Sequence, residues 1–169
     1  MAAIRSQEAS SSTSPCSYHV FLSFRGEDTR NSFTDHLYTA LGYAGFHTFK
    51  DDDGIEREEK IKSELQKAIK ESRISIVVLS KNYASSSWCP DELVMILKCR
   101  STSGHVVLPV FYDMDPSQLR KQMGSFEEAF VRHERKIEAK SGERRKEWMS
   151  KVEEWRAALR EVADLAGMN

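Results

Sequence analysis

The fold is decided by the segment Ile74-Ser75-Ile76-Val77-Val78-Leu79-Ser80. This segment is almost continuously β-branched and apolar, which is typical of a parallel strand covered on both faces. Three more segments bounded by turn residues are predicted strands: Tyr18–Phe24, Phe46–Phe49 and Val106–Tyr112. The last contains Pro109, which has no backbone N–H to donate, so this strand is expected to be an edge or locally irregular.

Helices are predicted between and after the strands, because apolar residues recur there every three or four positions. Gly45 is expected to end the first of them. Three stripes are formed by Phe33, Leu37, Ala40, Leu41 and Ala44, by Ile61, Leu65, Ala68 and Ile69, and by Trp148, Val152, Trp155, Leu159 and Val162. Helices are also expected from Glu92 to near Arg100, from Ser125 to near Glu138 and from Glu147 to near Ala166, with a charged exposed loop at 139–146. This alternation predicts an α/β domain with a central parallel sheet of four clear strands.

The 169-residue chain has a formal net charge of -1, with 40% hydrophobic and 30% charged residues, which is ordinary for one globular domain. The near-neutral charge gives no support to nucleic-acid or membrane binding. No apolar run is long enough to span a bilayer, and the N-terminus lacks the apolar core of a secretory signal. Three cysteines without metal-ligand spacing favour a reduced intracellular compartment. The Ser-rich residues 1–17 are expected to form a disordered leader.

Polar and charged residues follow two of the predicted strands. The segment Ser23–Arg30 follows the first strand, and Trp88–Leu93 follows the strand at Ile74–Ser80. Because ligands of an open α/β sheet bind beyond the carboxyl ends of the strands, the two segments are expected to share one crevice. Glu92 lies four residues after Trp88, so the two side chains share a helix face. The alternative is that Glu92 only stabilises the helix through its dipole.

The remaining motifs leave alternatives open or exclude common sites. The predicted charged turn Arg25–Asp28, at a helix start, could hold a phosphate through Arg25 and free backbone N–H groups. Its alternative is a solvated loop with acidic residues near the helix dipole. Asp51–Asp53 lack the spacing of a calcium loop and indicate a flexible loop. The chain has no GxGxxG, P-loop, HExxH or CxxC motif, so no metal and no cofactor are expected. Cys89 is expected to be a buried structural cysteine rather than a nucleophile.

Taken together and in order, the motifs resemble the Toll/interleukin-receptor (TIR) domain, specifically the plant type at the N-terminus of nucleotide-binding leucine-rich-repeat immune receptors. Each motif by itself is unspecific, whereas their order is highly specific. The resemblance places the TIR domain at residues 18–167 and leaves 168–169 as an end before further domains. The matching segments are Tyr18–Arg30, Phe49–Asp52, Trp88–Cys89, Glu92–Leu93, Leu108–Tyr112, Asp115–Ser117, Arg120–Gln122, Gly124–Phe126 and Trp155–Leu159.

The resemblance implies a flavodoxin-like, three-layer α/β fold with room for a short fifth strand. It also implies an NAD+ hydrolase that cuts the nicotinamide–ribose bond of NAD+ or NADP+ when the domain self-associates. The family's catalytic glutamate corresponds to Glu92, and its aromatic neighbour corresponds to Trp88. The family's ligand-facing first loop corresponds to Phe24, Arg25 and Gly26.

The resemblance also implies a mobile loop and two self-association surfaces. One surface corresponds to Asp35 and His36, and the second to the late helices around Gly124 and Trp155. The implied partners are further copies of the domain, as weak dimers or tetramers, and other TIR-containing immune proteins. The implied location is the cytoplasm, with the nucleus as a second location. The mobile loop corresponds to Asp51, Asp52, Asp53, Gly54, Ile55, Arg57 and Glu58.

Two functions remain open at this point: an NAD+-consuming enzyme that triggers defence and cell death, and a catalytically weak adaptor that acts as a scaffold. Glu92 favours the enzyme. Glu58 stands where the family usually carries Gly, which removes freedom at positive φ and adds a charge, and this favours the scaffold. Nuclease or cyclic-nucleotide chemistry, attributed to some relatives, has no support from the near-neutral charge.

Overall fold

The computed structural model describes residues 18–50 and 59–166. Within these residues four parallel strands form one sheet in the order β2-β1-β3-β4. All four predicted strands are confirmed, with ends that differ by one or two residues, and β4 lies at an edge, as Pro109 predicts. No fifth strand occurs in the described part of the chain. The strands are β1 (Val20–Ser23), β2 (Thr48–Lys50), β3 (Ile74–Leu79) and β4 (Val106–Phe111).

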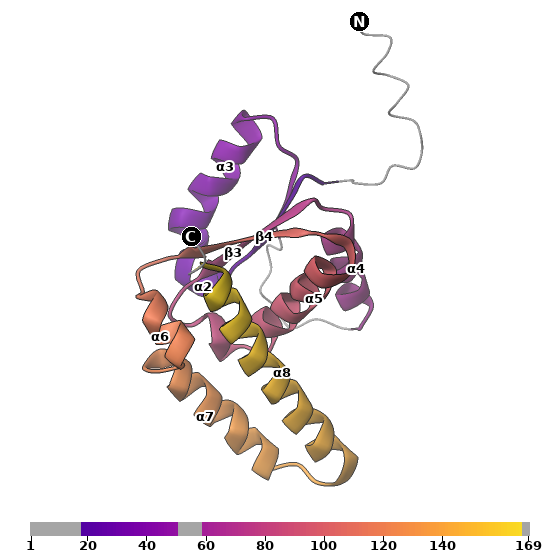
Figure 1. Cartoon of the computed structure of the whole chain (residues 1–169), viewed down its shortest axis with the longest axis vertical. Coiled ribbons are helices and arrows are strands. Elements are labelled where there is room, and N and C mark those ends of the chain that lie inside the picture. The colour runs from indigo at the N-terminus through magenta and orange to yellow at the C-terminus, as the bar shows by residue number, and fades with distance from the viewer. Residues whose placement is uncertain (1–17, 51–58, 167–169) are drawn as a thin grey trace, which may run out of the picture.

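Helices cover both faces of this sheet. Figure 1 shows α3 on one side of the sheet and α4, α5 and α8 on the other. The domain therefore has three layers, which is the flavodoxin-like arrangement that was predicted. The helical elements are α2 (Gly26–Thr29), the π-helical turn η1 (Arg30–Thr34), α3 (Asp35–Tyr43), α4 (Glu59–Lys70), the 3-10 turn η2 (Tyr83–Ser85), α5 (Trp88–Ser103), α6 (Pro116–Lys121), α7 (Ser125–Glu138) and α8 (Gly142–Ala166).

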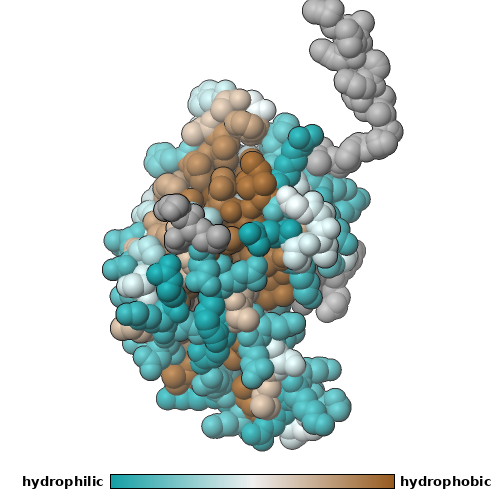
Figure 2. Space-filling model, in the orientation of Figure 1, coloured by the Kyte–Doolittle hydropathy of each residue, from teal (hydrophilic) through white to brown (hydrophobic). Residues whose placement is uncertain are grey.

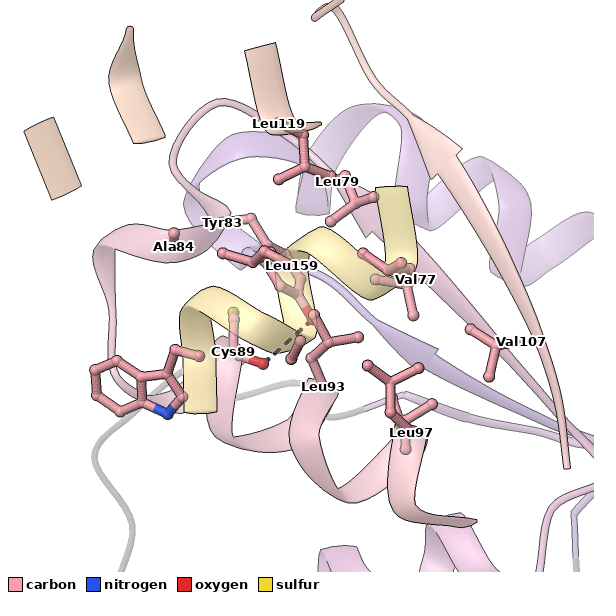
Figure 3. Close-up of a cluster of buried hydrophobic side chains, with 14 of the residues drawn as sticks. Val77, Leu79, Tyr83, Ala84, Cys89, Leu93, Leu97, Val107, Leu119 and Leu159 are labelled. Atoms are coloured by element: carbon pink, nitrogen blue, oxygen red, sulfur yellow. Dashed lines mark hydrogen bonds between the residues drawn. The ribbon is translucent and has the colours of Figure 1, made fainter. Parts of the chain in front are cut away.

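The central strands are apolar on both faces, which explains why their sequences do not alternate. Val20 and Leu22 of β1 pack in the cluster under α3. Phe21 of β1 and Val77 and Leu79 of β3 pack in the larger cluster with α4, α5, α7 and α8. Figure 3 shows part of this larger cluster. All five side chains are at most 3% exposed, and burying each stabilises the fold by about 1.5–3 kcal/mol.

The described helices cover the α3 side of the sheet only in part, because the β4 region of that face stays exposed. Val106 and Leu108 point to this face and are 47% and 46% exposed, whereas Val107 points to the other face and is buried. Figure 2 shows apolar surface in the upper half of the view, beside α3. The described helices therefore shield the two faces of the sheet unequally.

α5 and α8 are longer than predicted. α5 begins at Trp88, four residues before the predicted start, because Pro90 fits the first turn, where its missing N–H is not needed. The helix runs to Ser103. α8 begins at Gly142, so most of the charged segment 139–146 is helix and not the predicted loop. The Glu, Arg and Lys residues of this segment are good helix formers whose charges stay in water.

The first helical region also differs from the prediction. The segment Arg25–Asp28 is not a charged turn, because α2 already begins at Gly26. The apolar stripe of α3 is narrower than predicted, since Ala40 and Ala44 are exposed. The side chains that pack under this helix are Phe33, Leu37 and Leu41. α3 ends before Gly45, which has a φ of 92°, so the predicted stop is confirmed.

An aromatic cluster joins α8 to α7. Trp155 is fully buried, and its ring centroid lies 4.9 Å from that of His133 and 5.4 Å from that of Trp148. The Trp155 indole N–H donates to Asp91 Oδ1 at 2.8 Å. This confirms that the apolar stripe of α8 docks the helix on the body. It contradicts a surface role for Trp155 in self-association, because the side chain has no exposed area to offer a partner.

His133 is buried within this cluster and is 1% exposed. Its Nε2 lies 2.7 Å from the carbonyl oxygen of Ala84, and because a carbonyl can only accept, Nε2 carries the proton. Burial lowers the pKa of His133 below its usual 6.5; the bond to Ala84 opposes this, and nearby cations lower the pKa further. Burial also lowers the pKa of His105, whose Nε2 lies 2.7 Å from Ser75 Oγ.

We expect the free energy of unfolding to fall as the pH drops below about 6.5. The folded pKa of His133 lies below the unfolded value, so between the two values the unfolded chain binds more protons. Stability is therefore fully present above the unfolded pKa and is lost as the pH falls toward the folded one. Urea denaturation at about pH 5.5 and about pH 7.5 measures this difference.

The variant His133→Phe should lose part of this pH dependence, at most about 1.4 kcal/mol per pH unit, because one titrating group is removed. The remainder is expected from His105. The matched control is His36→Phe, which changes an exposed imidazole. If His133→Phe and His36→Phe keep the same pH dependence as the parent chain, the buried imidazole is not its source.

Candidate functional site

The carboxyl ends of β1 and β3 meet at the centre of the sheet. In a sheet of order β2-β1-β3-β4 the strands are all parallel, but β2 is added on one side of β1 and β3 on the other, so the strand order reverses between β1 and β3. Ligands of such folds bind beyond the carboxyl ends of the strands at this point. Ser23 is the last residue of β1, and Ser80 follows β3. The segments Ser23–Arg30 and Trp88–Leu93, which follow these two strands and were predicted to share one crevice, are therefore brought together here.

Glu92 lies in the second turn of α5 and is only 2% exposed. Its Oε1 accepts a hydrogen bond from Ser23 Oγ at 2.9 Å. Ser23 Oγ also lies 2.7 Å from the hydroxyl of Tyr83, which in turn donates to the carbonyl oxygen of Cys89 at 3.2 Å. Figure 3 shows this last bond as a dashed line from Tyr83, with Leu93 of α5 beside it. Glu92 is therefore not a solvated carboxylate whose only role is to stabilise the helix through its dipole.

Tyr83 supplies a neutral hydroxyl to the network. It is 0% exposed, and burial raises its pKa well above 10.0, with further increases from Cys89 and Glu92 and an opposing effect of the Ser23 bond. The phenol therefore keeps its proton over the whole physiological range. The sequence analysis did not single out Tyr83, since its partner Ser23 lies 60 positions away.

Asp28 ties the start of α2 to the loop after β3. Its carboxylate accepts from the Ser80 hydroxyl, from Asn82 N at 3.0 Å and from Asn82 Nδ2 at 3.1 Å. The interpretation of the acidic residues after β1 as part of a solvated loop did not predict this role of Asp28. The only signal available in the sequence was the pair of polar residues, Ser80 and Asn82, directly after a buried strand.

Of the predicted substrate-binding residues, Phe24, Arg25 and Gly26 directly follow β1, and Trp88 begins α5. Phe24 is 7% exposed, and its carbonyl oxygen accepts from Cys89 Sγ at 3.6 Å, which links the ends of β1 and α5. Arg25 is partly exposed and donates to Glu27 Oε1 at 3.1 Å, so a phosphate would compete with Glu27. Gly26 and Trp88 are the first residues of α2 and α5. Cys89 is buried and forms no disulfide bond within the described residues, as expected of a structural cysteine.

The residues predicted for self-association have different surroundings. Asp35 and His36 are exposed at the start of α3, and Asp35 Oδ1 lies 3.2 Å from Nζ of Lys50 in the same chain. Gly124 precedes α7 with a φ of 62° and is exposed. Trp155 lies in the core, as described above. The predicted mobile loop, Asp51–Glu58, lies outside the described residues, as do 1–17 and 167–169.

A cavity of about 380 Å³ lies between α6, α7 and α8, away from Glu92. Arg156 on its wall donates to Glu134 Oε2 at 2.7 Å and to Gln122 Oε1 at 2.9 Å. The guanidinium carbon also lies 4.3 Å from the ring centroid of Phe130. Arg156 is thus already engaged in joining the three helices, which favours a packing role for this cavity.

Neither a metal centre nor a membrane helix is found in the described part of the chain. No group of three or more His, Cys, Asp or Glu side chains there is arranged to hold a metal ion. None of the helices within residues 18–50 and 59–166 is long and apolar enough to cross a membrane.

A parallel sheet of this order, with a buried acid beyond its central strands, defines a flavodoxin-like domain with a candidate ligand site. The family model for the TIR domain matches residues 17–169, so the chain belongs to the TIR domain family. The chain is similar to the TIR domains in a structure of the activated Roq1 resistosome directly recognizing the pathogen effector XopQ. That match has a TM-score of 0.73 at 52% identity and covers 88% of this chain and 84% of that chain.

Plant disease resistance proteins are similar to the chain in sequence. Disease resistance protein RPV1 of Vitis rotundifolia is 52% identical over 173 residues, which cover 99% of this chain and 12% of RPV1. TMV resistance protein N of Nicotiana glutinosa is 49% identical over 159 residues, which cover 94% of this chain and 13% of that protein. The chain thus spans a small part of the length of these relatives.

We expect Asp28→Ala to destabilise the domain by about 2–3 kcal/mol, because three donors from Ser80 and Asn82 lose a charged acceptor. The matched control is Glu27→Ala, which removes the neighbouring carboxylate. The Glu27 side chain is 82% exposed, so its loss should change stability by less than about 0.5 kcal/mol. Urea denaturation measures both variants. Equal stabilities of the two variants would show that Asp28 does not hold α2 to the loop after β3.

Proposed function

We propose that this TIR domain hydrolyses NAD+ at the nicotinamide–ribose bond and that it acts in plant defence signalling and cell death in the cytoplasm. The observation that carries the proposal is the Glu92 carboxylate, which is buried beyond the central strands and held there by Ser23. Membership of the TIR family and similarity to plant disease resistance proteins support the biological setting.

The chemistry requires few groups. The nicotinamide ring of NAD+ is positively charged and leaves as a neutral molecule, so the leaving group needs no strong general acid. The ribose gains oxocarbenium character as the bond breaks, as in glycoside hydrolysis. A preorganised carboxylate with little access to water stabilises that positive charge far better than a solvated one. The proposal requires the buried Glu92 in its ionised form, and water completes the hydrolysis.

Neighbouring residues suit the rest of the substrate. Trp88, four residues before Glu92 on α5, offers an aromatic face for stacking. Arg25 suits a phosphate through charge-assisted hydrogen bonds, once Glu27 releases its guanidinium. Phe24 and Gly26 complete the proposed substrate loop. NADP+ carries the same scissile bond and is an equally suitable substrate class.

Self-association is the proposed control. The related Roq1 TIR domains belong to an activated resistosome, which favours assembly as the trigger. His36 is exposed at the start of α3 and is the residue through which we expect copies to contact one another. Gly124, exposed before α7, belongs to the second proposed surface. Other TIR-containing immune proteins are the expected partners beyond a second copy.

The second candidate function is a scaffold with little catalysis. The ion pair between Arg25 and Glu27 favours it, because the cation proposed for phosphate binding already has a partner. Glu58, which lies outside the described residues, favours it as well, because the family usually carries Gly at that position. Nicotinamide release from concentrated protein separates the two functions, since a scaffold releases none.

We expect Glu92→Gln to lower nicotinamide release by about 100-fold or more, because the amide keeps the shape but lacks the charge that stabilises the ribose cation. Gln is preferred over Ala, since Glu92 is buried and truncation would leave a cavity. The control is Glu138→Gln, the same change at the exposed end of α7. Chromatographic measurement of nicotinamide on folded proteins tests this. Unchanged turnover in Glu92→Gln removes Glu92 from the mechanism.

We also expect specific activity to rise with protein concentration, because weak polar interfaces fill only at high concentration. His36→Ala should flatten this rise without changing the urea midpoint, since the imidazole is exposed. The control is Arg145→Ala, an exposed change at the start of α8. NAD+ turnover over a wide concentration range, with light scattering on the same samples, measures the effect. A flat profile for the parent, or an unaltered rise in His36→Ala, contradicts control through this surface.

A further inference from the structure

We propose that Ser23 is a positioning residue for the Glu92 carboxylate, and that Tyr83 in turn fixes the Ser23 hydroxyl. The inference deepens the proposed function and rests on it, because it assigns the reaction to Glu92. It concerns two residues that do not themselves contact the substrate. Their role is to hold one carboxylate oxygen in a defined place.

The direction of the hydrogen bonds follows from what each group can donate. An ionised carboxylate only accepts, so the Ser23 hydroxyl donates to Glu92 Oε1 at 2.9 Å. With its single proton used, Ser23 Oγ acts as an acceptor for the Tyr83 hydroxyl at 2.7 Å. The single Tyr83 proton is shared, because the hydroxyl also donates to the carbonyl oxygen of Cys89 at 3.2 Å, the longer of its two contacts. The donors therefore form a chain from Tyr83 through Ser23 to Glu92.

This chain of hydrogen bonds is anchored in three different elements. Ser23 ends β1, where it is paired in register with Val77 of β3. Tyr83 lies in η2, and Glu92 lies in α5. The carboxylate is thus attached to the rigid sheet as well as to its own helix. The last torsion of a Glu side chain has a broad energy profile, so an external donor is needed to set the plane of the carboxylate.

Burial strengthens the hydrogen bonds from Tyr83 through Ser23 to Glu92. Ser23 and Tyr83 are 0% exposed and Glu92 is 2% exposed, so water does not compete for these bonds within the described surroundings. Hydrogen bonds are stronger and more cooperative in such a medium. Burial also keeps Tyr83 protonated, because its pKa is raised. A group held in this way needs little reorganisation when positive charge develops on the ribose.

The same contacts are compatible with a purely structural role, in which Ser23 and Tyr83 only satisfy each other in the core. The two roles differ in their kinetic consequences. A structural role predicts lower stability with unchanged turnover of the folded fraction. A positioning role predicts lower kcat at unchanged KM, and a shifted pH profile, because the ionised carboxylate loses a donor.

The experiment measures nicotinamide release by the full 169-residue chain and its Ser23→Ala, Ser23→Thr and Tyr83→Phe variants at saturating NAD+. The matched control is Ser75→Ala, because Ser75 is another fully buried strand serine whose hydroxyl bonds a side chain, that of His105. Each protein is first checked for folding by urea denaturation, and kcat is expressed per folded molecule.

We expect Ser23→Ala to lower kcat by about 10- to 100-fold at similar KM, with the acidic limb of the pH–rate profile moved to higher pH. Ser23→Thr, which keeps the hydroxyl, should recover most of the rate. Tyr83→Phe keeps the ring and should lower kcat by about 3- to 10-fold in the same direction. Ser75→Ala should leave the kcat of the folded protein within about twofold of the parent.

Two results overturn the proposal. One is a kcat within about twofold of the parent in Ser23→Ala with an unmoved pH profile. The other is equal losses in Ser23→Ala and Ser75→Ala. An inactive parent chain contradicts the proposed function instead. In that case a ¹³C NMR titration of the Glu92 carboxyl decides the positioning role: ionisation at higher pH in Ser23→Ala than in the parent supports it, and identical titration overturns it.

Discussion

The parallel pairing of β1 with β3 is the constraint on which the rest of the domain depends. It places the two strands whose carboxyl ends carry Ser23 and Ser80 next to each other at the centre of the sheet. Both faces of these strands must then be covered, which requires helices on each side and forces the residues beyond the strands into a common volume. The network around Glu92 and the anchor at Asp28 are consequences of this one pairing.

Polar groups in the interior gain their stability from partners that come from other elements. Glu92 has Ser23, Trp155 has Asp91, and His133 has the carbonyl of Ala84. Each bond joins segments far apart in the chain and would leave a buried group unsatisfied if the segments were packed differently. These bonds therefore select one arrangement of the helices, while apolar burial supplies most of the free energy that keeps them together.

Sequence patterns predict what local composition controls. The four strands, the stop at Gly45, the helix Ser125–Glu138 and the joint position of Trp88 and Glu92 on one helix all follow from residue spacing. The burial of Glu92 does not, because its partner Ser23 is 69 positions away. The role of Asp28 was missed for the same reason, since its partners lie 52 and 54 positions away. For Trp155 the local pattern was right and the resemblance was wrong. The periodicity of α8 predicted that this side chain is buried, whereas the resemblance placed it at a self-association surface.

The position of Pro109 has a consequence for how the domain behaves when it is crowded. The N–H groups of Val106, the first residue of β4, and of Tyr112, which follows the strand, donate toward β3. Pro109 lies an odd number of positions from both residues, so its nitrogen faces away from β3. A foreign strand that approached this side would find a missing donor in the middle of the ladder. Cross-strand polymerisation of the kind that builds amyloid is thereby disfavoured at an edge with exposed Val106 and Leu108. High local concentration can then favour ordered contacts between folded helices over fibre growth.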